Sequence, residues 1–142
     1  MHYLQLRLKQ FHPKKGSNMN MRALLNWQWE GYTRYHNSRF NLLIHIFAVP
    51  LFLAGNVGLV VAAISRHYLF AFFSLGVAII ALVLQGRGHR IEKIPPEPFT
   101  GIANAIARIF LEQWITFPRF VLSGGWLRGI RRKPDSIKSN HH

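Results

Sequence analysis

The sequence predicts an all-α integral membrane protein built on a hairpin of two membrane-spanning helices. Residues 42–64 form a run without a formal charge, and residues 68–84 form a second one, with only residues 65–67 between them. A helix needs roughly 17–25 apolar residues to cross the hydrocarbon core of a bilayer. Two such runs this close together are a poor pattern for a buried pair of soluble helices, so a membrane hairpin is the better prediction.

The charge distribution supports the same class of protein. The chain has 18 Lys and Arg against 5 Asp and Glu, a formal net charge of +13, and its basic residues flank the apolar runs. This arrangement suits an anionic lipid surface, and we expect no nucleic-acid partner. The turn of the hairpin carries only Arg66 as a basic residue, whereas basic residues precede the first span and follow the second. Both termini are therefore expected in the cytoplasm, with the hairpin in a bacterial inner membrane or, in a eukaryote, the endoplasmic reticulum.

Regions outside the hairpin complete a single membrane domain, residues 21–127. Residues 21–35 combine good helix formers with Trp and Tyr, which predicts a helix at the membrane–water interface. The segments 1–20 and 128–142 are predicted to be basic tails, the first of them mobile.

A further helix is predicted over residues 102–122, with a polar stripe formed by Asn104, Arg108, Glu112 and Arg119. It either lies flat in the headgroup region or re-enters the bilayer with that stripe turned toward the hairpin. Pro118 predicts a kink near its end. Arg108 and Glu112 are four residues apart and are expected to form an ion pair, which makes Glu112 the weaker candidate for a metal ligand.

Candidate metal ligands gather at one end of the hairpin. The start of the first span and the end of the second lie on the same side of the membrane, which brings His36, His45, His89 and Glu92 into one region. The chain has no cysteine, so a metal site must use imidazole and carboxylate ligands. Three His and one Glu on one side of a hairpin predict that these four residues bind one metal ion, with Glu92 as a ligand or as support for an imidazole.

Two spacings bear on this prediction. His89 and Glu92 are three apart and share a face if the helix continues through them. His36 and His45 are nine apart, two and a half turns, so they would point in opposite directions on a continuous helix. Both can serve one site only if the helix breaks between them, and Asn37 and Ser38 are plausible breakers.

The stretches "YHNSRFNLLIHIFAVPLFLAG" and "LQGRGHRIEKIPPEP" resemble a small membrane family of Fe(II)-dependent 2-hydroxy fatty acid dioxygenases, which was long described as a domain of unknown function and has a fungal member in phytosphingosine breakdown. The resemblance covers roughly residues 29–122. It places His36, His45 and His89 on the histidines of the family, and Asn41, Pro50 and Gln85 on its Asn, Pro and Gln. Ala48 stands where the family tends to have Gly, and "KIPPEPF" also departs, which suggests a bacterial-type branch.

The resemblance implies an Fe(II) cofactor and an activity that uses O₂ to shorten a long-chain 2-hydroxy fatty acid by one carbon. It also implies catalytic roles for Asn41, Gln85 and Glu92. A basic side chain at the interface, from Arg39, Arg87 or Arg90, is a candidate to neutralise the substrate carboxylate. Membrane lipid is a further expected partner, and a homo-oligomer is left open. The alternatives are another metal-dependent membrane lipid enzyme and a non-catalytic membrane adaptor.

Overall fold

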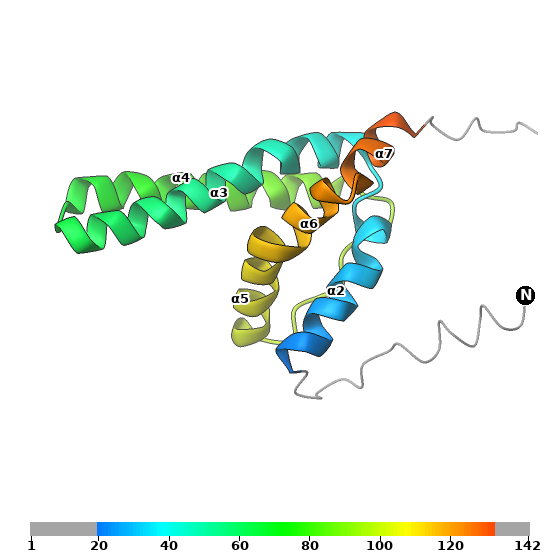
Figure 1. Ribbon diagram of the computed structural model, residues 1–142, viewed down its shortest axis with the longest axis horizontal. Coiled ribbons are helices and arrows are strands. Elements are labelled where there is room, and N and C mark those ends of the chain that lie inside the picture. The colour runs from blue at the N-terminus through cyan, green and yellow to red at the C-terminus, as the bar shows by residue number, and fades with distance from the viewer. Residues whose placement is uncertain (1–19, 133–142) are drawn as a thin grey trace, which may run out of the picture.

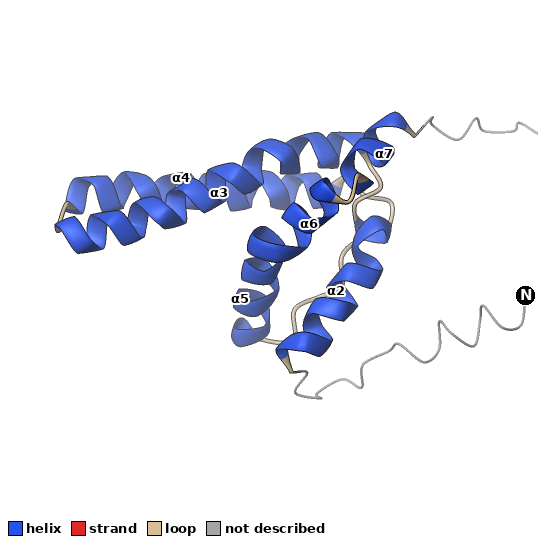
Figure 2. Cartoon of the chain, in the orientation of Figure 1, coloured by secondary structure: helices blue, strands red, loops and turns tan. Residues whose placement is uncertain are grey.

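The computed structural model describes residues 20–132, and over this range the chain is helical without a β-strand (Figure 2). The elements are α2 (Met21–Tyr35), α3 (Arg39–Ser65), α4 (Tyr68–Arg90), α5 (Ile102–Leu111), the π-helical segment η1 (Glu112–Thr116), α6 (Phe117–Leu122) and α7 (Gly125–Arg131). The all-α prediction is confirmed. Most of each predicted tail lies outside the described residues, but Asn20 caps α2 by accepting a hydrogen bond from the Ala23 N–H.

Helices α3 and α4 form the predicted hairpin, and both are long and apolar enough to cross a membrane. The connection between them is as short as expected, because Arg66 adopts a left-handed conformation with φ of 56° that reverses the chain. Both helices extend beyond the uncharged runs. In particular, α4 continues through Gly86 and Gly88 to Arg90, so that Gln85 and His89 are helical residues with fixed directions.

Small residues let the two long helices approach closely. A Cβ atom on Gly55 would lie 2.8 Å from the Ser74 carbonyl oxygen and 2.9 Å from the Ala78 nitrogen, and one on Gly58 would overlap the Ser74 hydroxyl. Ala81 is fully buried in the same seam. Close packing of this kind holds helices together in lipid, where burial of apolar surface gives no driving force.

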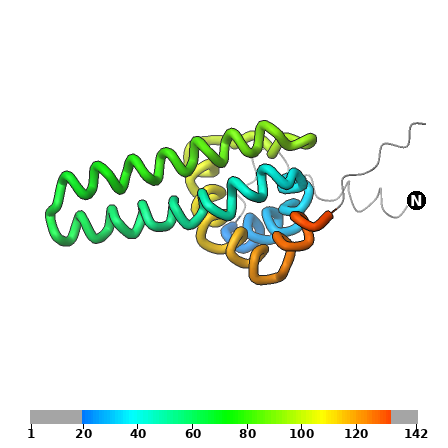
Figure 3. Tube along the Cα trace, turned by 90° about the horizontal axis from the view of Figure 1, so that it is seen from above, coloured from blue at the N-terminus to red at the C-terminus, as the bar shows by residue number. Residues whose placement is uncertain are grey.

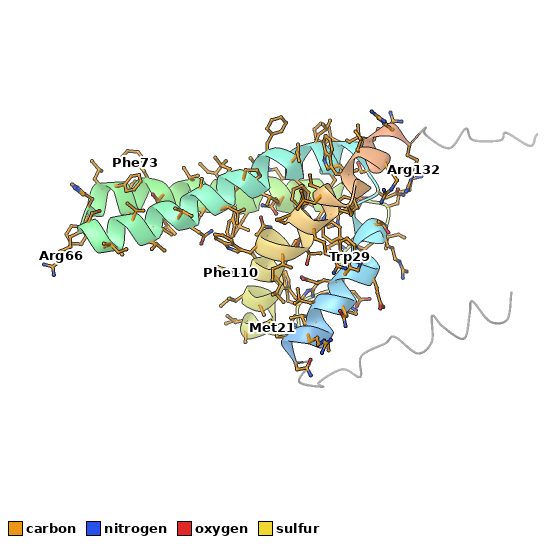
Figure 4. All side chains as sticks on the ribbon, in the orientation of Figure 1. Met21, Trp29, Arg66, Phe73, Phe110 and Arg132 are labelled. Carbon is orange, nitrogen blue, oxygen red and sulfur yellow. The ribbon has the colours of Figure 1, made fainter. Side chains whose placement is uncertain are left out.

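The half of the hairpin near the turn carries large apolar side chains that no other described helix covers. Ile64, Leu69 and Phe73 are 80%, 71% and 61% exposed, and Figure 4 labels Phe73 on this half of the hairpin. An exposed apolar surface of this extent is what a hairpin presents to lipid chains.

The remaining helices gather at the open end of the hairpin, away from Arg66 (Figure 1). The view from above agrees and places α2 and α5–α7 beside the same half of α3 and α4 (Figure 3). Their contact with the hairpin is a core of Tyr32, Leu42, Val49, Phe117 and Phe120.

The C-terminal part corrects the start of the predicted tail. Residues 128–131 belong to α7 and are not part of a tail, because Trp126 anchors this helix by donating its indole N–H to the Leu42 carbonyl, 2.9 Å away. Residues 102–122 are helical as predicted, and a π-helical turn directly precedes α6, which contains Pro118; the predicted kink there stays a prediction. Pro118 has no N–H to donate within the helix, and Phe117 donates to the Glu112 carbonyl five residues earlier.

Candidate metal centre

Four side chains from four segments of the chain converge at the open end of the hairpin. They are His36 after α2, His45 in α3, His89 near the end of α4, and Glu112 at the start of η1, and their ligand atoms lie within 4.8 Å of one another. We call these four residues the His₃Glu group. The Glu112 Oε1 atom lies 3.2 Å from Nε2 of His36, 3.8 Å from Nε2 of His45 and 4.0 Å from Nε2 of His89.

The break between α2 and α3 brings His36 and His45 together, as the spacing predicted. Helix α2 ends at Tyr35, and His36 leaves the helix with φ of −127° and ψ of 59°. The chain then turns over Asn37 and Ser38 before α3 begins. The two imidazole centroids are 4.7 Å apart as a result, and that of His89 lies 4.8 Å from the first and 4.9 Å from the second.

Hydrogen bonds on the far side of two imidazoles fix the direction of their lone pairs. His36 Nδ1 lies 3.0 Å from the Tyr32 carbonyl, and His45 Nδ1 lies 3.0 Å from the Asn41 carbonyl. A carbonyl only accepts, so each Nδ1 donates, and the Nε2 atom of each ring is directed toward Glu112. Both Nε2 atoms are buried and lack a hydrogen-bond partner among the described residues.

Glu112 places a carboxylate beside these imidazole nitrogens. Burial raises the pKa of Glu112, but the close contact with His36 and the neighbouring imidazoles outweigh burial and lower it to about 2. The carboxylate is therefore ionised at neutral pH. Tyr32 donates its hydroxyl to the same Oε1 at 3.4 Å, and burial together with Glu112 raises its pKa well above 10, which keeps the hydroxyl protonated.

This donor set fits a metal ion. Imidazole nitrogens and a carboxylate oxygen are ligands of divalent transition metals such as iron, zinc, copper and nickel. A proton on His36 Nε2 would let that atom donate to Glu112. It would still leave His45 Nε2 without a hydrogen-bond partner. A cation at the centre would satisfy all four groups together.

Glu92 does not belong to the His₃Glu group, which corrects the prediction that it is a ligand. Its carboxylate accepts hydrogen bonds from the backbone N–H groups of Asn37 and Ser38, at 3.0–3.1 Å, and from the Asn41 amide at 2.7 Å. The positive end of the α3 dipole favours an anion there. Glu92 therefore stabilises the turn that positions His36, and it holds Asn41, whose carbonyl accepts from His45.

Asn41 and Gln85, the other two residues with an expected catalytic role, occupy different places. Asn41 is fully buried against Glu92 and Gly88, where a Cβ atom would overlap the Asn41 side-chain oxygen. Gln85 faces Gln113 of η1, and their amides exchange hydrogen bonds of 3.0 Å and 2.5 Å. This pair fixes η1 against α4. A catalytic role for either residue stays a prediction.

A cavity of about 430 Å³ opens beside the His₃Glu group between α2, α4 and α5. His36, His89, Glu112, Gln85 and Gln113 are among its polar lining residues. The rest of its wall is mainly apolar and includes Trp27, Leu82, Pro95, Pro96, Phe99 and Ile109. A site with apolar walls and a few convergent polar groups suits an amphipathic small molecule.

The arginines proposed from the sequence for an acidic headgroup are not equivalent. Arg90 lines the cavity, whereas the guanidinium of Arg39 contacts the Arg132 carbonyl, and Arg87 is exposed and does not line the cavity. Arg108 lines the cavity although it was expected to pair with Glu112. Glu112 makes its ion pairs with the three histidines instead.

Glu112 is the functional candidate that the sequence reasoning ranked too low. A signal was present: Glu112 is one of only five acidic residues and lies in a mainly apolar stretch of helix. A carboxylate in such a place needs a buried partner. Comparisons with protein-family models, curated proteins and solved structures find no match to this chain.

Proposed function

We propose that this protein is an Fe(II)-dependent dioxygenase of the membrane that removes one carbon from long-chain 2-hydroxy fatty acids. The observation that carries the metal-dependent part is the His₃Glu group, in which two buried imidazole nitrogens without a partner face an ionised carboxylate. The choice of iron and of this substrate is supported by the sequence resemblance described above.

The proposed reaction balances without a further reductant. The 2-hydroxy acid R–CH(OH)–COOH and O₂ give R–COOH, CO₂ and H₂O, so that the substrate supplies the four electrons that reduce O₂. The C1–C2 bond breaks, and C1 leaves as CO₂. The His₃Glu residues would hold the iron, which when bound supplies redox chemistry and a place for the hydroxyl and carboxylate oxygens of the substrate.

The position of the cavity supports a lipid-like substrate. Three residues of the His₃Glu group, His36, His89 and Glu112, line it at the open end of the hairpin. Leu82 on α4 belongs to its apolar wall. An acyl chain could therefore follow the apolar wall while its acidic head lies at the metal. With the hairpin in the bilayer and both termini in the cytoplasm, this site would open at the cytoplasmic surface.

The experiment is product analysis of detergent-purified protein loaded with Fe(II) under air. A long-chain 2-hydroxy fatty acid should give the acid one carbon shorter, detected by mass spectrometry, with one O₂ consumed per product and no need for 2-oxoglutarate. His89→Ala should abolish product, and His67→Ala is the matched control because His67 lies exposed at the turn of the hairpin.

Metal content separates the outcomes. Equal product from wild type and His89→Ala would refute the proposed activity. Bound metal without product from any chain length would leave another metal-dependent lipid enzyme as the better reading. Protein that retains no metal and forms no product would favour the membrane adaptor, with the polar groups serving helix packing.

A further inference from the structure

Arg108 is a cation without an ion-pair partner among residues 20–132. It is half-buried, and the ion pairs found in this part of the chain all join a histidine to Glu112. Burial lowers the pKa of Arg108, but an arginine remains charged in proteins. A partly desolvated positive charge is favourable only where an anion or several hydrogen bonds compensate it.

The guanidinium is held firmly in one place. It lies between the faces of Trp27 and Phe99, at 4.8 Å and 4.7 Å from their centroids. It also donates to the carbonyls of Glu97 and Pro98, at 3.0 Å and 3.2 Å. These contacts use two of its five N–H groups and leave the others for a ligand. A guanidinium that is already fixed in place loses little conformational entropy when it binds a carboxylate.

Arg108 also shares the cavity with His36, His89 and Glu112 of the His₃Glu group. Arg108 and Glu112 both line the cavity, and they are four residues apart along the helix, a rise of about 6 Å. A carboxylate between them could present one oxygen to the guanidinium and the other to a metal ion that the His₃Glu group would hold. The wall beyond them is apolar, as an alkyl chain requires.

We propose that Arg108 recognises the carboxylate of the substrate and makes the cavity selective for single-chain acids over neutral lipids of the same length. The proposal rests on the proposed function for the identity of the substrate. Arg90 also lines the cavity but is exposed, and no described aromatic ring or carbonyl fixes its guanidinium.

The test is direct binding to full-length protein in detergent, measured by calorimetry with and without metal. The ligands are tetradecanoic acid, tetradecanol and tetradecyl phosphate, which share one chain and differ in the head. Arg108→Gln should weaken binding of the acid by about 10–100-fold, the cost of a lost charge-assisted hydrogen bond, and binding of the alcohol by less than about twofold. Arg108→Lys keeps the charge but not the planar guanidinium, so its affinity for the acid should lie between those of the wild type and Arg108→Gln.

Arg119→Gln is the matched control. Arg119 comes from the same stretch of helix and also stacks on a tryptophan, with its guanidinium 4.0 Å from the Trp29 centroid, but it does not line the cavity. This variant should bind both ligands as the wild type does.

Several results would overturn the proposal. Equal weakening of acid and alcohol would make Arg108 a support for the 91–101 loop only. Loss of acid binding in Arg90→Gln and not in Arg108→Gln would assign the recognition to Arg90. Tighter binding of the phosphate than of the acid would assign the site to a phospholipid headgroup. This experiment measures binding, so its result is independent of product formation. The role of Arg108 can be supported even if the protein forms no shortened acid, and it can be refuted even if the protein does.

Discussion

Replacing Glu112 by glutamine should remove metal binding without unfolding the protein. The substitution keeps the size of the side chain and removes the charge. In the wild type, Oε1 of Glu112 faces the Nε2 atoms of His36, His45 and His89, at 3.2 Å, 3.8 Å and 4.0 Å. Loss of a group that only orients a ligand typically lowers metal affinity by about 10–100-fold. Loss of a ligand itself should exceed that range, so we expect a decrease of more than about 100-fold, or about 2.7 kcal/mol.

The metal-free form of Glu112→Gln should be at least as stable as metal-free wild type. The wild-type carboxylate faces imidazole nitrogens that lack a donor. The amide of a glutamine could donate to His36 Nε2 and so pair an atom that is otherwise unsatisfied. Thermal unfolding in detergent after chelation measures this difference.

Glu92→Gln is the matched comparison, and the opposite pattern is expected. The change removes the anion from the N-terminus of α3, where the carboxylate accepts from Asn37, Ser38 and Asn41. Stability should fall by about 1–3 kcal/mol, and metal affinity should fall by no more than about 10–100-fold. Competition with a chelator gives the two affinities. Metal binding that survives in Glu112→Gln and disappears in Glu92→Gln would refute the assignment of the fourth ligand.

Three further predictions concern the surroundings of the site. Gly88→Ala should destabilise the protein by about 1–3 kcal/mol and lower metal affinity, because the new Cβ would overlap the Asn41 side chain. Gly86→Ala is the control, because open space surrounds Gly86, and it should leave thermal stability unchanged or raise it. Tyr32→Phe should lower metal affinity by about tenfold and shift the Co(II) ligand-field spectrum, because the hydroxyl no longer orients Glu112 while the ring still stacks on His36, 4.0 Å between centroids; an unchanged spectrum would refute this role. Reporter fusions at the two ends of the chain should both read as cytoplasmic, and two reporters on the other side of the membrane would overturn the orientation.

Much of the fold could be predicted because the physics involved is local or follows from chain length. The uncharged runs at 42–64 and 68–84 are long enough to span a bilayer, and three residues between them allow only a hairpin. The break after Tyr35 was predicted from the requirement that His36 and His45 reach one site. The hairpin geometry then brought His89 to the same end.

The choice between Glu92 and Glu112 as the carboxylate beside the three histidines could not be made from spacing, because it depends on how separate helices pack. In sequence, Glu92 is the acidic residue near His89, but α4 ends at Arg90 and the chain turns its carboxylate toward the start of α3. Arg108 and Glu112 have the spacing of an ion pair on a regular α-helix. The Glu112 N–H still donates to the Arg108 carbonyl, but the Arg108 side chain donates to the carbonyls of Glu97 and Pro98, a contact between separate segments that helical spacing does not anticipate.

The four residues of the His₃Glu group come from two parts of the molecule, the hairpin and the helices packed against it. His45 and His89 belong to the hairpin, whose two helices are already held together by the small residues Gly55 and Gly58. His36 and Glu112 lie outside it, in segments that contact the hairpin through a modest core and through the paired amides of Gln85 and Gln113. A metal ion would therefore join two parts that are otherwise joined by few contacts, and part of its binding free energy would become stability of the bundle against the hairpin. The same joint forms one wall of the cavity, so the shape of the substrate site should depend on the metal as well.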